Sequence, residues 1–368
     1  MSLSFSYDYP KSGATGGVLL LRDESTSIFG GSSSSAEPVA PIWPDALITG
    51  PNAFDQPTTT AEAPELGWTK VEDEPCNPQL GEPYRKNGGV RSSTTPVTLY
   101  FTPDVGGVPG IISAIEVDYY KGITEDKSVE ENLIGSYFSD EQTAADGSTF
   151  HSLAVALRDY DEHDLCDTSA PISHTNLEKI TIAPAGAAEN IPLSENDEEL
   201  QTGWEQGSCV PTVGVHWGKD VVGGSRLTYE AANLVPVVPM YSSKTSAIQA
   251  VMFISTNMKQ TFPEDCLGKI GYPFNMATTV ACTEGKVNMW DQSPGVLQAN
   301  QPPFYMCSNF CRADCELTGS TDGWYNTMHF VFKNITAQAG GDFEDCKGIA
   351  TAINGQFCRP EAGPGQGV

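Results

Sequence analysis

The sequence predicts an all-β or β-rich protein made of two related antiparallel β domains from an internal duplication, with extended N- and C-terminal arms. Three observations predict this class. The chain has 36 glycines and 26 prolines among 368 residues, and both residue types disfavour helix interiors. Short segments rich in β-branched and aromatic residues alternate with turn-forming stretches. A set of landmark residues also occurs twice in the same order.

The two ends of the chain are expected to be arms. Residues 1–65 are rich in Gly, Ser, Pro and Thr, a composition that buries too little apolar surface to fold alone. They still contain aromatic residues such as Tyr7 and Trp43, so we interpret them as an arm that packs on another surface. Residues 359–368 form a Pro/Gly tail.

The repeat defines the expected domains. The first copy contains Trp68, Cys76, Gly81, His151 and Cys166, and the second contains Trp204, Cys209, Gly214, His329 and Cys346. Two strand segments also match: Val97–Tyr100 with Val238–Tyr241, and Ser113–Ile115 with Ser246–Ile248. The landmarks predict β domains at residues 66–170 and 202–358, joined by an acidic linker at 171–201. The second copy has an insertion within residues 258–323.

Individual strands follow from local composition. Residues 97–101 and 111–120 flank the turn-forming stretch around Gly106-Gly107, which predicts a hairpin with a longer loop. Residues 235–241 and 247–255 repeat this arrangement in the second copy. Residues 151–157 and 328–332 supply a further strand in each copy.

Charge and hydropathy exclude some partners. The 20 basic and 47 acidic residues give a formal net charge of −27, and the basic residues do not cluster as a phosphate-binding surface requires. We therefore predict no nucleic-acid partner. No segment approaches the roughly 20 consecutive apolar residues of a membrane helix, so we predict no membrane span.

Histidines are the main candidates for chemistry. His216 and His329 would form a metal or acid–base site if they met, because neutral imidazole is a common metal ligand. The first copy has Pro83 where the second has His216, whereas a duplicated metal site would keep both ligands. We therefore favour structural histidines and predict no metal and no cofactor.

Other patterns give no catalytic site. Cys307, Cys311 and Cys315 are four residues apart, a spacing that fits neither structural zinc nor a radical iron–sulfur motif. The acidic run 159–164 lacks the glycine of an EF-hand loop. The common nucleophile, phosphate-binding and zinc-protease motifs are absent from the sequence. We predict that the protein is not an enzyme.

Taken together, the acidic duplicated chain, its paired Cys-x-Pro-x-x-Gly and Thr-x-His landmarks and its two arms resemble the pyrenoid shell proteins (PyShell) of diatoms and related algae. The resemblance covers about residues 66–358. It implies a chloroplast protein that self-assembles into a thin sheet around the Rubisco matrix of the pyrenoid and supports CO2 concentration and fixation. The implied partners are further copies of the chain and Rubisco or other pyrenoid components. A stromal location would favour reduced cysteines.

Two alternatives remain open. The ten cysteines and the sequon Asn334-Ile335-Thr336 are compatible with a secreted, disulfide-stabilised β-rich binding protein. A metal-dependent enzyme that uses His216, His329 and acidic partners is the second alternative. Thiol counting separates the secreted protein from the shell protein, and metal analysis tests the enzyme.

Overall fold

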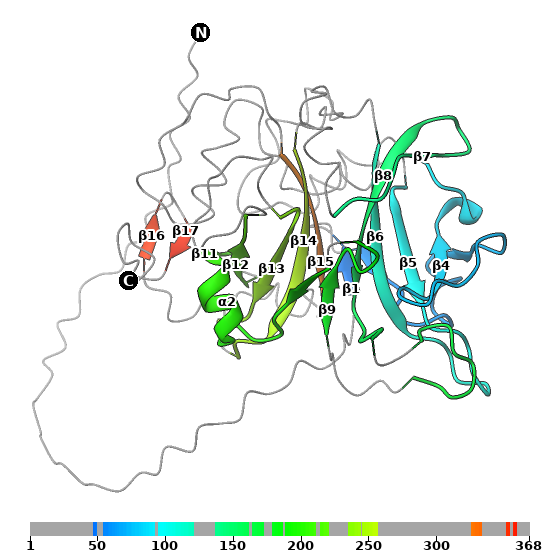
Figure 1. Ribbon diagram of the computed structural model, residues 1–368, viewed down its shortest axis with the longest axis horizontal. Helices are drawn as coiled ribbons and strands as arrows, with labels where there is room; N and C mark the ends of the chain where they lie inside the picture. The colour runs from blue at the N-terminus through cyan, green and yellow to red at the C-terminus, as the bar shows by residue number, and fades with distance from the viewer. Residues whose placement is uncertain are drawn as a thin grey trace, which may run out of the picture. The chain divides into compact units, whose positions relative to one another are not determined.

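The computed structural model describes a strand-rich protein (Figure 1). The described residues lie in one compact unit, Pro38–Val368. They are 47–49, 54–92, 95–120, 137–161, 164–172, 179–186, 188–210, 214–220, 235–243, 245–256, 325–332, 351–353 and 356–358. Their strands form two antiparallel sheets, which confirms the predicted β-rich class. The expected insertion at 258–323, Cys346, and the arm and tail residues 1–46 and 359–368 lie outside the described residues.

The first sheet carries the first copy. Its described strands lie in the order β10-β9-β8-β6-β5-β4-β3, with β7 also paired to β8. Every residue of β5 and β6 is buried, so both faces of the centre of this sheet are covered. The strands are β3 (Thr69–Lys70), β4 (Glu82–Arg85), β5 (Val97–Phe101), β6 (Ile112–Tyr120), β7 (Gln142–Thr143), β8 (Thr149–Ala156), β9 (Ile180–Ile182) and β10 (Glu189–Ile191), and the short 3-10 turn η1 (Asn87–Gly89) follows β4.

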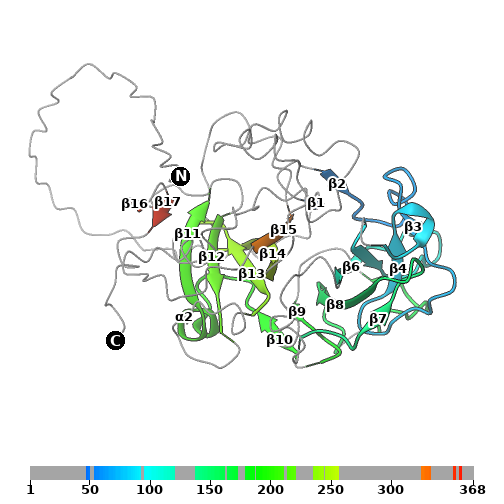
Figure 2. The same ribbon diagram turned by 90° about the horizontal axis from the view of Figure 1, so that it is seen from above.

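The second sheet carries the second copy. Its described strands lie in the order β16-β17-β11-β12-β13-β14-β15-β1-β2 (Figure 2). The short helix α2 (Glu198–Gly203) lies directly before strand β11 (Glu205–Val210) of this sheet, and the Asp197 carboxylate caps the helix by accepting a hydrogen bond from the Glu199 N–H at 2.9 Å. The strands are β1 (Leu47–Thr49), β2 (Phe54–Gln56), β11 (Glu205–Val210), β12 (Gly214–Gly218), β13 (Val237–Tyr241), β14 (Ile248–Thr256), β15 (Tyr325–Val331), β16 (Thr351–Ile353) and β17 (Gln356–Cys358).

Five neighbouring strands repeat between the sheets. The order β3-β4-β5-β6-β8 in the first sheet matches β11-β12-β13-β14-β15 in the second. Both copies also share an irregularity, because the register shifts between Tyr100 and Phe101 in one and between Met240 and Tyr241 in the other. The duplication therefore extends from strand order to the position of a bulge.

The registers correct two of the expected matches. Because the bulges coincide, Val97 corresponds to Val237, one residue before the expected Val238. Ser113 corresponds to Gln249 and not to Ser246. Sequence matching missed these shifts because the loops between β5 and β6 and between β13 and β14 differ in length.

The match of the two histidines is also wrong. His151 lies opposite Tyr119 on β6, whereas His329 lies opposite Met252 on β14. Met252 corresponds to Glu116, and the residue opposite Glu116 is Ala154. The two histidines are therefore three residues out of step along equivalent strands.

A hairpin precedes each copy and completes the sheet of the other copy. Hairpin β9–β10 precedes the second copy and pairs with β8 of the first sheet. Hairpin β1–β2 precedes the first copy and pairs with β15 of the second sheet. Residues 47–49 and 54–65 are thus part of the fold and not of an arm. The segment 171–201 contains β9, β10 and most of α2, so it is more than the acidic linker expected from its composition.

The two sheets share one hydrophobic core. A single cluster of buried residues takes Leu99, Ile115 and Val155 from the first sheet together with Val251 and Phe330 from the second. The hydroxyl of Tyr119 on β6 also donates to the backbone oxygen of Ile254 on β14 at 3.1 Å. Neither copy buries its inner face alone, and the expected pair of domains is one packed unit.

The glycine that ends each Cys-x-Pro-x-x-Gly motif should not tolerate a side chain. Gly81 and Gly214 have φ of +110° and +99°. A Cβ at Gly81 would lie 2.5 Å from the Phe101 oxygen, and one at Gly214 would meet the equivalent Tyr241 oxygen. Gly81→Ala and Gly214→Ala should each lower the free energy of unfolding by about 2–4 kcal/mol, measured by urea denaturation.

Gly147 provides the control for this prediction. Its φ is +84°, but no atom lies within 4 Å of a built Cβ. Gly147→Ala should therefore cost only about 1–2 kcal/mol, the conformational part alone. Equal losses at Gly147 and Gly81 would contradict a steric role for the motif glycine.

Candidate functional site

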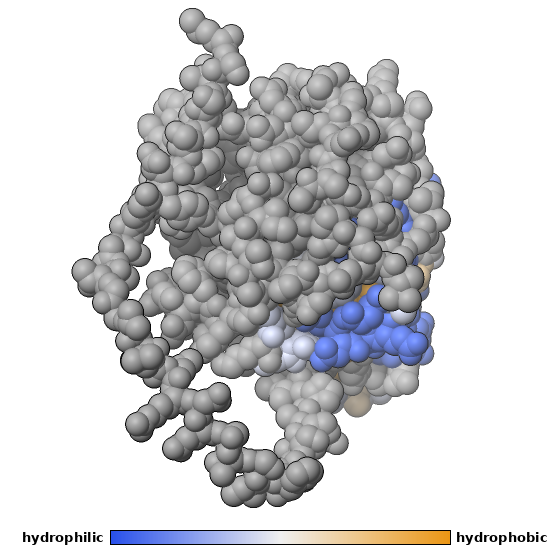
Figure 3. All heavy atoms as spheres, turned by 90° about the vertical axis from the view of Figure 1, so that its left-hand side faces the viewer, coloured by the Kyte–Doolittle hydropathy of each residue, from blue (hydrophilic) through white to orange (hydrophobic). Residues whose placement is uncertain are grey.

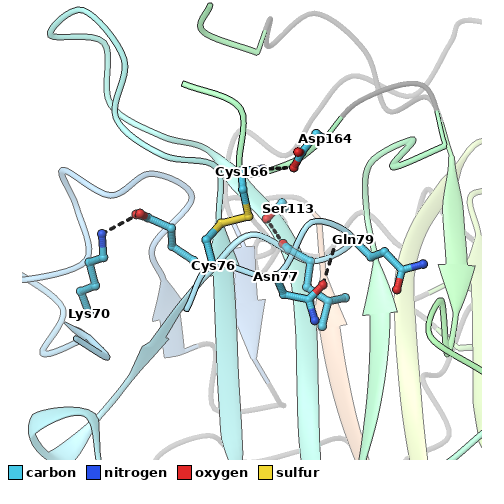
Figure 4. Close-up of a disulfide and its surroundings, with 9 residues drawn as sticks. Lys70, Cys76, Asn77, Gln79, Ser113, Asp164 and Cys166 are labelled. Carbon is cyan, nitrogen blue, oxygen red and sulfur yellow. Dashed lines mark hydrogen bonds and ion pairs between the residues drawn. A yellow bond between two sulfur atoms is a disulfide. The ribbon is translucent and has the colours of Figure 1, made fainter. Parts of the chain in front are cut away.

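The Cys-x-Pro-x-x-Gly motif of the first copy forms a closed turn held by a disulfide (Figure 4). Cys76 is bonded to Cys166, with the two Cα atoms 5.9 Å apart. The backbone of Asn77 exchanges hydrogen bonds with Gly81, and its side chain accepts from the Gln79 N–H at 2.9 Å. The hydroxyl of Ser113 on β6 donates to the Leu80 oxygen beneath the turn. The motif therefore fastens a surface loop to the sheet.

The second copy shows part of the same arrangement. Cys209, which matches Cys76, is also disulfide-bonded. Gly214 ends the motif under the Tyr241 oxygen, as Gly81 does under the Phe101 oxygen. The landmark cysteines of the described residues are thus oxidised structural groups.

Both landmark tryptophans have the same surroundings. Trp68 and Trp204 are 1% and 2% exposed. The amino groups of Lys86 and Lys219 each lie 5.6 Å from the centre of the corresponding indole ring. Lys86 and Lys219 are separated by 133 residues, the same offset as Gly81 and Gly214. The sequence therefore contains a repeated lysine that the landmark residues did not include.

A buried charged cluster lies on β6 of the first sheet. Arg91 donates to the Glu116 carboxylate at 2.6 Å and to the Asp118 carboxylate at 2.5 Å. The hydroxyl of Ser152 on β8 donates to Asp118 at 2.8 Å, and the guanidinium lies 5.1 Å from the ring centre of Phe150. Glu116 and Asp118 are two residues apart on one strand, so their side chains share a face. One cation therefore holds two carboxylates against the sheet.

A second ion pair extends this cluster. Arg85 on β4 makes a bidentate contact with Glu74, with both N–O distances at 2.6 Å, and donates to the Thr98 hydroxyl at 2.8 Å. Arg85 is 2% exposed. Partial burial acts to raise the pKa of Glu74, but the hydrogen bond and charge of Arg85, together with the Arg91 charge, outweigh it and lower the pKa below its ordinary value.

Asp118 is the most perturbed carboxylate of the cluster. Burial raises the pKa of Asp118 to about 7, and the neighbouring Glu116 charge acts in the same direction. Arg91 and the Ser152 hydroxyl oppose that rise. A carboxyl that titrates near neutrality can exchange a proton, but here both carboxylates point at one arginine within a packed sheet. The arrangement supports a structural role, and the landmark search did not find it because the second copy has Met252 and Ile254 at the corresponding positions.

The structure brings His216 and His329 into electrostatic range of each other. His216 on β12 lies opposite Met240, and His329 on β15 lies opposite Met252, so the two share one face of the second sheet. Burial and the His216 charge lower the pKa of His329 to about 3, which keeps its imidazole neutral. Within the described ranges, no group of three or more His, Cys, Asp or Glu side chains is placed to hold a metal ion.

His151 has a local role. Its Nδ1 lies 2.9 Å from the Ser139 oxygen, so the ring links β8 to the segment before β7. This contact is typical of a histidine that supports the end of a strand. His151 lies on the first sheet, whereas His216 and His329 lie on the second.

Comparisons of the chain with protein-family models, with curated proteins and with solved structures find no match. None of the helices in the described part of the chain is long and apolar enough to cross a membrane.

Proposed function

We propose that this chain is a structural protein that assembles with copies of itself into a sheet, as its resemblance to pyrenoid shell proteins implies. The observation that carries the proposal is the repeated order β3-β4-β5-β6-β8 and β11-β12-β13-β14-β15 within one compact unit. Such a subunit has two similar versions of each surface. Contacts between unlike patches of identical subunits propagate into extended assemblies when the rotation from one subunit to the next does not close a ring.

The proposed setting is the pyrenoid of a chloroplast, where the sheet would surround the Rubisco matrix and support CO2 fixation. This part of the proposal rests on the resemblance of the repeat landmarks. A fluorescently tagged chain expressed in a diatom should collect at the boundary of the Rubisco matrix. An even distribution through the stroma would contradict the location and leave self-assembly to be judged by the next experiment.

Assembly should be promoted by salt. A net charge of −27 makes subunits repel each other, and this repulsion is screened over about 8–10 Å at near-physiological ionic strength. The described surface visible in Figure 3 is predominantly hydrophilic. The residues around α2 contribute exposed charge, including Glu198 and Glu199. Sedimentation and electron microscopy over a salt series should show sheets that increase with salt.

A variant with two fewer negative charges tests whether charge repulsion causes this salt effect. Glu198→Gln together with Glu199→Gln removes two exposed charges while Asp197 still caps α2. This variant should assemble at lower salt than the unmodified chain. A full-length protein that remains monomeric at high concentration across the whole series would overturn the proposed function.

A second candidate function is favoured by one observation. The Cys76–Cys166 disulfide and the oxidised Cys209 are typical of an oxidising compartment, so they favour a secreted, disulfide-stabilised binding protein. Thiol counting on protein from its native compartment, under denaturing and non-reducing conditions, decides between the two. Ten free thiols would exclude the secreted protein, and fewer than ten would count against a reducing stroma.

A further inference from the structure

Two lysines occupy equivalent positions in the two copies, but only one of them has a carboxylate partner among the described residues. Lys86 follows β4 and Lys219 follows β12, and each amino group lies 5.6 Å from the centre of an indole ring. The Lys219 amino group forms an ion pair with the Glu189 carboxylate of β10. The Lys86 amino group forms no ion pair or hydrogen bond with any residue that the structure describes.

The registers of the two hairpins explain this difference. Glu189 lies opposite Ile182 in hairpin β9–β10, and Phe54 lies opposite Thr49 in hairpin β1–β2. Ile182 and Thr49 in turn lie opposite equivalent residues of β8 and β15. Phe54 therefore has the position of Glu189. The first copy has an uncharged residue at the position that supplies the carboxylate in the second.

Lys86 differs in this respect from every other lysine whose side chain the structure describes. Those lysines are Lys70, Lys179 and Lys219, and each forms an ion pair with a carboxylate. Partial burial lowers the pKa of Lys86 from its ordinary value. The hydrogen bond to Asp161, in contrast, raises the pKa of Lys179. Lys86 is thus a partly buried amine whose charge no described carboxylate stabilises.

We propose that Lys86 is a preferred site of acylation, which takes an acyl group from an activated donor such as a thioester. The unprotonated Nζ of Lys86 attacks the carbonyl carbon of the donor, and a C–N bond forms. The bond from that carbon to sulfur breaks, the thiolate leaves with the electron pair, and the proton lost by the amine passes through solvent to the thiolate. The product is a neutral amide. Its formation breaks no described ion pair and removes a charge from a partly buried position.

The ion pair of the equivalent lysine opposes the same step. An amine attacks through its lone pair, which is free only after the ammonium group has lost a proton. At Lys219 that loss would leave the Glu189 carboxylate, whose side chain is only 16% exposed, without its cation. The indole ring is equally distant from Lys86 and Lys219, so it does not account for a difference between them. The inference is independent of the proposed self-assembly.

The test is competitive acetylation of the full-length, unmodified protein with p-nitrophenyl acetate. This probe is small and uncharged, so the net charge of −27 does not steer it, and its leaving group does not reduce disulfides. After brief reaction in mildly alkaline buffer, the protein is denatured and the remaining amines are acetylated with a deuterated reagent. Mass spectrometry then gives the fraction of each lysine that reacted in the folded protein. Lys86 should be acetylated about fivefold faster than Lys219, the factor that one ion pair accounts for.

Exposure alone predicts a different order of reactivity. The Lys70 side chain is 38% exposed, against 23% for Lys179 and 22% for Lys219. If exposure governed acylation, Lys70 would react first. Lys86 that reacts no faster than these three lysines would overturn the proposal. Repeating the reaction in urea should make all four rates similar, and an order that persists in urea would show that the fold does not select Lys86.

Glu189→Gln is the matched variant, because it removes the charge that holds Lys219 and leaves an amide of similar size. Acetylation of Lys219 should increase about fivefold in this variant, to the level of Lys86, while the rate at Lys86 stays unchanged. Far-UV circular dichroism confirms that the variant remains folded. A rate at Lys219 that does not respond to the loss of the Glu189 charge would show that ion pairs do not select the acylation site, and it would contradict the proposal.

Discussion

Replacing Trp68 or Trp204 with alanine should lower the free energy of unfolding by about 3–5 kcal/mol, the usual cost of emptying a large buried aromatic site. Trp68 and Trp204 are among the least exposed side chains of the described residues, and both belong to the core cluster shared by the two sheets. Because that core is common, either substitution should destabilise both copies together. Thermal denaturation followed by near- and far-ultraviolet circular dichroism should show one cooperative transition at a lower temperature.

The lysine over the Trp68 indole provides the control. Lys86→Ala removes the cation near this ring while leaving the aromatic volume in place, whereas Lys219→Ala would also break the ion pair between Lys219 and Glu189. The cation–ring contact contributes about 0.5–1 kcal/mol at a partly exposed site, so Lys86→Ala should lose far less stability than Trp68→Ala. An unchanged unfolding midpoint in both tryptophan variants would show that the indoles are not structural anchors.

Removing Arg91 should lower the free energy of unfolding by about as much as removing either tryptophan, and this loss should depend on pH. Arg91→Ala leaves Glu116 and Asp118 buried at 8% and 1% exposure without their cation. Breaking a buried ion pair from one side costs about 3–5 kcal/mol, because the remaining charge stays desolvated. The loss should be largest above neutral pH, where Asp118 ionises, and smaller near pH 4, where Asp118 stays protonated in the folded state. Urea denaturation at several pH values measures it.

The sign of the pH dependence in the unmodified protein follows from Asp118. Its pKa is about 7 in the folded state, against about 3.9 for an unperturbed aspartate. Between these values the unfolded chain releases the proton and the folded protein retains it, so stability from this group is full below about pH 4 and declines as the pH rises through 7. Asp118→Asn should flatten that decline.

The double variant completes this test. In Arg91→Ala with Asp118→Asn, one of the two stranded carboxylates is neutral, so the loss of stability should be smaller than in Arg91→Ala alone. Equal losses in the single and double variants, or a loss that is independent of pH, would show that the cluster does not carry the predicted electrostatic coupling.

The spacing of the landmarks predicted the duplication but not the full alignment. The Cys76/Cys209 and Gly81/Gly214 offsets were informative because a turn of fixed length and a positive φ angle restrict both residue type and spacing. The match of His151 with His329 failed because histidine occurs at the start of strands in many different surroundings, so its position carries little information about the alignment. Only the register with β6 and β14 separates these positions.

By itself, the sequence determined the strand-rich class and the place along the chain of three strands in each copy, since β-branched and aromatic runs, turn residues and motif glycines act over a few residues along the chain. The tertiary structure alone decided which partners meet across long separations. It joined β1 to β15 and Cys76 to Cys166, and it placed both inner faces in one core. The reason is physical: backbone pairing and apolar burial do not depend on sequence distance, so a local pattern leaves open which of several compatible edges and faces a strand will cover.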